Sequence, residues 1–164
     1  TIGTNDEFFG LRAPTEMMTL FQGDKAFLAV DNTPHTWVSA KHLAAWRMWL
    51  AHSIFERPVP VLTVDAAQQG GGLDVAVEVA GGGDLESVTL FHAHNATTDW
   101  RFARWQGEAL TEIDGPGCRP RRFNGRLSMS QDVYTAWYVE AGDRLDGLPG
   151  LVSSQVEVRP PQCG

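Results

Sequence analysis

Residues 25–30 read KAFLAV, and this apolar run decides the fold expected for the first part of the chain. A run without polar alternation is typical of a strand covered on both faces, as in a parallel sheet flanked by helices. Residues 2–4 predict the end of a neighbouring strand, and residues 14–21 predict a short helix with Pro14 in its first turn. The pattern therefore predicts an α/β layer.

A long amphipathic helix is expected over residues 37–55. Its apolar side chains recur at steps of three and four, at Leu43, Trp46, Leu50 and Ile54. The helix ends before residues 57–60, RPVP, because two prolines exclude further helical backbone. Two parallel strands and two helices cannot cover both faces of a sheet. Residues 1–57 by themselves are therefore expected to expose a large apolar patch that needs a covering partner.

The pattern changes after residue 60 to an alternation with a period of two, which is typical of half-buried strands. The clearest segments are residues 75–79, 88–91, 100–105, 134–141 and 152–158. Glycine-rich turns separate the strands, and their number, about seven, and their spacing are typical of an immunoglobulin-like sandwich. We therefore expect two domains, an α/β domain over residues 1–57 and an all-β sandwich over residues 58–164.

The net charge of −7 is unevenly distributed. Residues 1–57 hold five Lys and Arg against six Asp and Glu, whereas residues 58–164 hold eight against fourteen. An acidic surface does not attract phosphate backbones, and the one basic cluster, at Arg119, Arg121 and Arg122, is short, so no nucleic-acid partner is expected. No apolar run reaches the length of a membrane span, so none is expected.

Two polar turns follow the expected parallel strands, and each carries a residue suited to acid–base chemistry. Asp6 follows the first strand and His35 follows the second. Adjacent parallel strands bring such loops side by side, as in the triad of an α/β-hydrolase. The histidine takes a proton from a serine hydroxyl, and the carboxylate fixes its tautomer. Glu7 is the competing acid, and the alternative for these residues is an ordinary turn or capping role.

Four stretches carry a resemblance to a known family. They are GTNDEFF at residues 3–9, LFQGDKAFLAVDNTPH at 20–35, SVTLFHAHNATTDWRFARW at 87–105 and YTAWYVEAGDRLDGLPGLVSSQVEVRP at 134–160. Together they resemble the C-terminal part of the PhoPQ-activated pathogenicity-related proteins. The resemblance implies the C-terminal strands and helices of an α/β-hydrolase fold followed by an immunoglobulin-like β-sandwich, with Asp6 as triad acid and His35 as triad base.

The nucleophile turn of that family, G-x-S-x-x-G, is absent from the chain. Its serines, none of which lies in such a turn, are Ser39, Ser53, Ser87, Ser128, Ser130, Ser153 and Ser154. We therefore expect part of an esterase- or peptidase-type serine hydrolase, whose nucleophile comes from upstream sequence or a second chain and whose substrate is a small-molecule ester or peptide. The alternatives are a secreted binding or signalling protein that keeps the scaffold without turnover, and an adhesion module.

Three further patterns give weaker indications of function. His92 and His94 share a strand face at a spacing used in metal sites, but a zinc site needs further ligands from elsewhere, so neither metal nor cofactor is assigned. Aromatic residues that suit a sugar-stacking surface, or more commonly the core between two sheets, are Trp100, Phe102, Trp105, Trp137 and Tyr138. Cys118 and Cys163 allow one disulfide or two free thiols. Acidic charge, few lysines and the two cysteines favour a secreted or periplasmic location.

Overall fold

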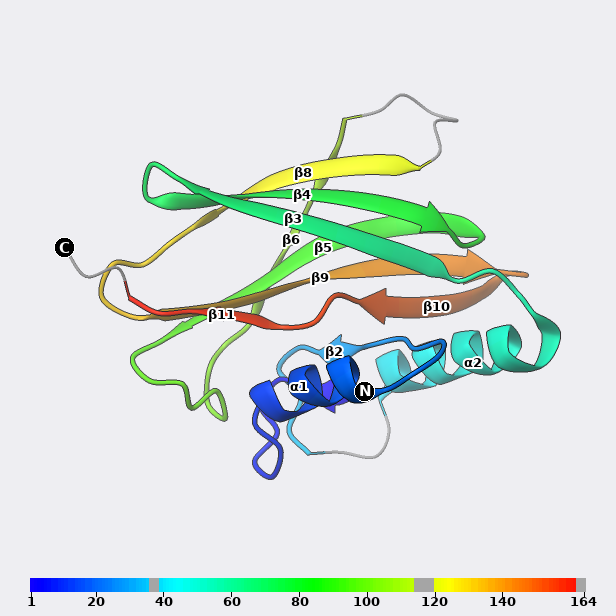
Figure 1. The fold of residues 1–164 in the computed structure, drawn as a ribbon, viewed down its shortest axis with the longest axis horizontal. Coiled ribbons are helices and arrows are strands. Elements are labelled where there is room, and N and C mark those ends of the chain that lie inside the picture. Colours follow the sequence, from blue (N-terminus) through cyan, green and yellow to red (C-terminus); the bar gives the residue numbers. More distant parts are fainter. Residues whose placement is uncertain (36–38, 114–119, 162–164) are drawn as a thin grey trace.

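The computed structural model describes residues 1–35, 39–113 and 120–161. Two antiparallel sheets dominate it, and the N-terminal segment forms a further layer against one of them (Figure 1). Of the described residues, 47% lie in strands and 16% in two helices.

The first sheet has the strand order β3-β4-β8-β7. Its strands are β3 (Pro60–Gln69), β4 (Gly72–Gly81), β7 (Thr111–Glu112) and β8 (Arg121–Ser128). The second sheet has the order β10-β9-β5-β6, and β11 also pairs with β9. Its strands are β5 (Asp84–Asn95), β6 (Gln106–Ala109), β9 (Tyr134–Leu145), β10 (Leu148–Ser153) and β11 (Glu157–Arg159). Neighbouring strands in both sheets run antiparallel.

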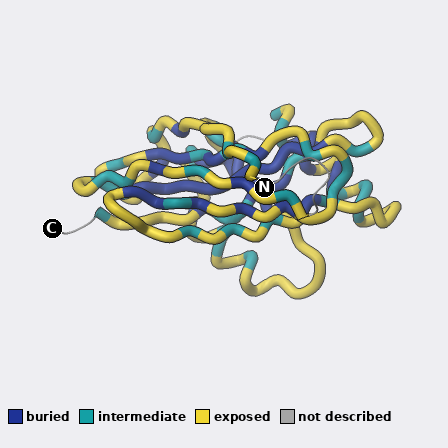
Figure 2. The backbone as a smooth tube through the Cα atoms, turned by 90° about the horizontal axis from the view of Figure 1, so that it is seen from above, coloured by how far each residue is buried: buried dark blue, intermediate teal, exposed yellow. Residues whose placement is uncertain are grey.

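The two sheets pack face to face around an apolar core. Val75, Val77 and Val79 of β4 point into it, as the period of two in the sequence predicts. Trp137 and Val139 of β9 meet them from the second sheet. The buried residues run along the central strands, while the connecting loops are exposed (Figure 2). Burying one large apolar side chain contributes about 1.5–3 kcal/mol, so this core is a major source of stability.

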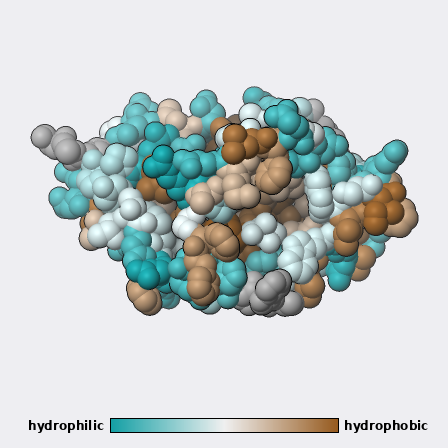
Figure 3. Space-filling view, turned by 60° about the horizontal axis from the view of Figure 1, so that its bottom comes forward, coloured by the Kyte–Doolittle hydropathy of each residue, from teal (hydrophilic) through white to brown (hydrophobic). Residues whose placement is uncertain are grey.

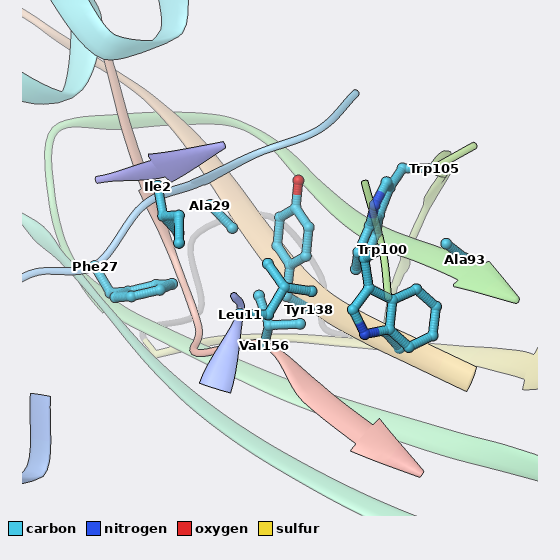
Figure 4. Packing of buried hydrophobic residues seen from close by; sticks show 10 residues of the cluster. Ile2, Leu11, Phe27, Ala29, Ala93, Trp100, Trp105, Tyr138 and Val156 are labelled. Carbon is cyan, nitrogen blue, oxygen red and sulfur yellow. The ribbon is translucent and has the colours of Figure 1, made fainter. Parts of the chain in front are cut away.

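Residues 1–57 lie against the outer face of the second sheet (Figure 1). Their elements are β1 (Ile2–Gly3), α1 (Arg12–Leu20), β2 (Ala29–Val30) and α2 (Ala40–Phe55). A second apolar cluster joins the two layers: Tyr138 lies between Ile2 and Ala29 on one side and Trp105 on the other (Figure 4). Since adjacent residues of a strand face opposite sides, β9 is buried on both of its faces.

Within the apolar run, residues 27–30 are buried on both faces, and an antiparallel sheet covers one of these faces. Phe27 and Ala29 pack in the cluster on the second sheet, whereas Leu28 and Val30 pack against α2 and β10. Only the last two residues of the run form a strand, which pairs in parallel with β1 over two residues.

The predicted fold is therefore wrong. The chain is not the C-terminal part of an α/β-hydrolase followed by an immunoglobulin-like sandwich, because it is mostly strand, with antiparallel sheets and only two helices among the described residues. The parallel pairing that an α/β layer requires is limited to β1 and β2. The physical reason for the error is that an apolar run reports burial on both faces without reporting what covers them.

Helix α2 buries a face that its sequence pattern did not indicate. Ser39 caps the helix by accepting a hydrogen bond from the His42 amide at 3.3 Å. The residues that the fold buries are His42, Ala44, Ala45 and Met48. The predicted apolar face is exposed, at Leu43, Trp46, Leu50 and Ile54. A Cβ on Gly150 of β10 would lie 2.8 Å from Met48 Sδ, so the helix face that carries Met48 approaches β10 closely.

Polar contacts strengthen the attachment of this layer. Lys41 Nζ of α2 lies 2.7 Å from Asp31 Oδ1 and 2.8 Å from Glu140 Oε2. Asp31 follows β2 and Glu140 belongs to β9, so one ammonium group links three parts of the fold. In addition, the backbone amide of Ser153 donates to the carbonyl oxygen of Phe27 at 2.8 Å.

Smaller expectations also differ from the structure. Residues 100–105 form no strand, and residues 152–158 are divided between β10 and β11. Cys118 and Cys163 lie outside the described residues.

Candidate functional site

Asp6 and His35 lie within hydrogen-bond distance of each other. Nδ1 of His35 is 2.9 Å from Oδ2 of Asp6. The side chain of Asp6 is 6% exposed and that of His35 is 36% exposed, so the carboxylate is sheltered while the imidazole is accessible. Since Nδ1 faces the carboxylate, Nε2 is the nitrogen that remains to accept a proton.

The second oxygen of Asp6 accepts two backbone hydrogen bonds. The donors are the amide of Phe8 at 2.8 Å and the amide of Phe9 at 2.9 Å. Burial raises the pKa of this carboxyl group, but the hydrogen bonds from His35 and from the two amides outweigh it, and the pKa lies below its usual value of 3.8. Asp6 is therefore ionised at neutral pH and fixed in orientation.

The parallel pair β1 and β2 brings the two loops together. The amide of Thr4 donates to the carbonyl oxygen of Val30 at 2.9 Å, and the amide of Asn5 donates to that of Thr33 at 3.0 Å. A Cβ on Gly3 would lie 2.2 Å from the Thr33 carbonyl oxygen. The loops can approach this closely only because position 3 has no side chain.

Glu7, the competing acid, binds a different group. Its Oε2 accepts a hydrogen bond from the backbone amide of His35 at 3.1 Å, whereas the imidazole bonds to Asp6. The ring of Phe8 lies edge-on to the imidazole with their centroids 5.1 Å apart, and the ring of Phe9 is at 5.7 Å. Two carboxylates and two aromatic rings thus position His35.

Two asparagines hold the site loops against the loop that precedes β6, and the sequence interpretation missed both. Nδ2 of Asn5 donates to the carbonyl oxygens of Trp100 at 3.0 Å and Ala103 at 2.8 Å. Asn32 bonds both backbone groups of Trp105, donating to its carbonyl oxygen at 2.9 Å and accepting from its amide at 2.8 Å. Asparagine is common beside turns, but sequence spacing does not indicate which distant backbone it will bind.

A cavity of about 480 Å³ opens beside this pair, and both Asp6 and His35 line it. Much of its wall is apolar, from Ile2, Phe9, Met17, Met18, Phe21 and Phe27. His42 and Trp46 of α2 complete one side. Figure 3 shows the face that carries the N-terminal layer, where apolar side chains gather around a hollow. The arrangement combines a general base with an apolar binding space.

The described serines do not supply a nucleophile to this site. No serine or cysteine lines the cavity within the part of the chain that the structure describes. Ser39, at the start of α2, is instead engaged with His42, whose Nδ1 lies 2.7 Å from the serine Oγ.

The other candidate residues lie elsewhere. His92 and His94 are on β5, where Nε2 of His92 faces Glu108 Oε1 at 3.3 Å and Nδ1 of His94 faces Thr135 Oγ1 at 3.0 Å. Across residues 1–35, 39–113 and 120–161, no group of three or more His, Cys, Asp or Glu side chains is placed to hold a metal ion. Neither of the described helices is long and apolar enough to cross a bilayer.

The aromatic residues weighed as a sugar-stacking surface are mostly interior. Trp137 lies between the two sheets, whereas Trp100, Trp105 and Tyr138 pack between the second sheet and the N-terminal layer. Phe102 alone of the five is exposed, at 92%. Four of these rings therefore serve packing and present no flat surface to a ligand.

No family model, curated protein or solved structure matches the chain. A function therefore has to be inferred from the geometry of the site.

Proposed function

We propose that His35 and Asp6 are the general base and the orienting acid of a hydrolase that transfers an acyl group to water. The observation that carries the proposal is the 2.9 Å contact between His35 Nδ1 and Asp6 Oδ2. The carboxylate is fixed by two backbone amides and the imidazole is open to the cavity. A fixed carboxylate and an accessible imidazole are what general base catalysis requires.

The proposed reaction proceeds in two steps, acylation of a serine and hydrolysis of the acyl serine by water. Nε2 of His35 removes the proton from a serine hydroxyl while the serine oxygen attacks the carbonyl carbon of the substrate. The imidazolium, stabilised by Asp6, then gives that proton to the departing alcohol or amine. Water releases the acyl group from the serine in the same manner.

In this proposal the serine comes from polypeptide beyond these 164 residues, either upstream sequence or a second chain. Among the serines that the structure describes, none forms a hydrogen bond with His35. The exposed apolar residues of α2, Leu43, Trp46, Leu50 and Ile54, support a covering partner at this place. Because Trp46 also lines the cavity, such a partner would reach the site directly.

The proposal is tested by labelling the complete native protein, including any polypeptide beyond these 164 residues, with a fluorophosphonate probe. We expect labelling, and a fall in its rate by about a thousandfold or more in His35→Ala and in Asp6→Asn. His52→Ala is the matched control, because His52 bonds the Arg57 carbonyl oxygen at 2.8 Å and does not line the cavity. Absence of label on the native protein, or labelling that survives His35→Ala, would contradict the proposal.

A second role is favoured by one observation, the lack of a serine or cysteine in the described cavity wall. A secreted binding or signalling protein would use the same apolar cavity without turnover. The native protein would then bind an apolar ligand and take no fluorophosphonate label.

A further inference from the structure

The cavity beside His35 has a wall that selects for the chemistry of its occupant. Side chains of β1, of α1 and of the segment before β2 make it largely apolar, and Met17 and Phe21 form its rim with more than half of their surface exposed. Its volume of about 480 Å³ is within the range of cavities that enclose small organic ligands. An apolar group of some length fits this space.

The charges around the cavity argue against an anionic occupant. Among the described residues that line it, no Lys or Arg side chain is present, and the ionised carboxylate of Asp6 is at its polar end. The second imidazole in the wall, His42, is 3% exposed, and burial lowers its pKa, which favours the neutral form at pH 7. A carboxylate or phosphate placed here would face Asp6 and would find no Lys or Arg side chain in the described wall. Thr1 also lines the wall, and burial lowers the pKa of its α-amino group, which shifts that group toward its neutral form.

We propose that this cavity binds the apolar acyl chain of a neutral ester, with the ester carbonyl beside the His35 imidazole. The inference rests on the proposed hydrolase function, which it extends by naming the substrate class. The serine oxygen forms a bond to the carbonyl carbon, the bond from that carbon to the alcohol oxygen breaks, and the alcohol leaves with the proton carried by His35. Water then cleaves the acyl serine. The carboxylate product is repelled by Asp6, which favours its release.

Binding of unreactive neutral analogues tests the inference without need of the serine. The probes are hexan-2-one, octan-2-one and decan-2-one, each measured by displacement of the neutral dye N-phenylnaphthylamine from the protein. We expect affinity to rise about fourfold for each added methylene group until the chain fills the cavity. Octanoate is the matched anion, and we expect it to bind at least about tenfold more weakly than octan-2-one, because its charge loses hydration beside Asp6.

Two substitutions on α1 locate the binding. Met17→Glu places a carboxylate on the cavity wall and is expected to weaken decan-2-one binding by about tenfold or more. Leu20→Glu is the matched control, because Leu20 is 78% exposed on the same helix and does not line the cavity, and we expect no change. Both residues are exposed enough for the variants to fold.

The outcomes separate this inference from the hydrolase proposal. Affinity that does not depend on chain length, or octanoate that binds as well as the ketone, would overturn the acyl site even where fluorophosphonate labelling succeeds. The acyl site is supported if affinity depends on chain length, if Met17→Glu weakens the binding and if Leu20→Glu leaves it unchanged. If the native protein also takes no fluorophosphonate label, these binding results assign the site to binding without turnover.

Discussion

The two sheets and the N-terminal layer bury their apolar side chains to very different extents. Between the sheets, large residues such as Trp137 and Leu90 are almost completely enclosed. Of the large apolar side chains that are exposed in the described chain, ten lie in residues 1–57 and five in residues 58–164. The candidate site and its cavity are built on the layer that is less well enclosed.

This difference indicates a division of roles. The sheets supply the stable scaffold, whereas the N-terminal layer contributes fewer buried apolar side chains and is held to the second sheet by these and by specific polar links. Regions with fewer buried contacts open more readily, and ligand-binding segments commonly belong to such regions. We therefore expect the N-terminal layer to open before the sheets unfold.

The largest expected effect compares one tryptophan from each region. Trp137→Ala removes a ring that is 1% exposed between the sheets and should lower the free energy of unfolding by about 3–5 kcal/mol. Trp46→Ala removes a ring that is 41% exposed on α2 and should cost about 1 kcal/mol. Urea denaturation of both variants measures the two losses. Equal losses would show that the two regions are equally well packed.

The next effect concerns the charged link between the regions. Lys41→Met leaves the Glu140 carboxylate, whose side chain is 9% exposed, without its cation, and should cost about 3 kcal/mol. The double variant Lys41→Met/Glu140→Gln should recover a large part of that loss. Hydrogen exchange should show faster exchange of α2 and β2 amides in Lys41→Met while β4 amides keep their protection. Faster exchange throughout both sheets would argue against separate opening.

Substitutions of two glycines test whether the close approach of Gly3 to the Thr33 backbone aligns the site. Gly3→Ala puts a Cβ against the Thr33 carbonyl oxygen, and it should cost about 1–3 kcal/mol and separate His35 from Asp6. Gly10→Ala is the control, because a Cβ there meets no atom within 4 Å, and it should change stability by no more than about 0.5 kcal/mol. Urea denaturation gives the stabilities, and NMR of the imidazole reports the contact. Matching effects of the two substitutions would refute the steric explanation.

The smallest effect is the dependence of stability on pH through Asp6. Its pKa in the folded chain lies below the usual 3.8, so the unfolded chain takes up the proton first on acidification. Its contribution is present above pH 3.8 and is lost as pH falls through the folded pKa. At pH 7, Asp6→Asn should lower the free energy of unfolding by about 1–2 kcal/mol. The difference in stability between the variant and the unchanged protein should shrink as the pH falls below 3.8. A difference that stays constant from pH 6 to pH 2.5 would contradict this linkage.

Part of the site could be predicted from local sequence. Polar turns after two apolar segments pointed to Asp6 and His35, and the structure places their side chains in contact. Asn5 and Asn32 could not be found in the same way, because their partners are backbone groups in the loop before β6. These partners lie 95 residues away for Asn5 and 73 residues away for Asn32. Such long-range hydrogen bonds leave no trace in local spacing.

Local sequence by itself predicted the approximate positions of both helices and of several strands, because periodicity and turn residues act over a few neighbouring positions. It also predicted a strand over residues 100–105 that does not form. Only the tertiary structure decided what covers each element. Residues 27–30 are covered on one face by an antiparallel sheet, and α2 places Met48 beside Gly150 while Trp46 and other large apolar residues of the helix stay exposed. An apolar pattern shows which surface is suited to burial, whereas the surface that is buried and its partner depend on shape complementarity between segments far apart in the chain.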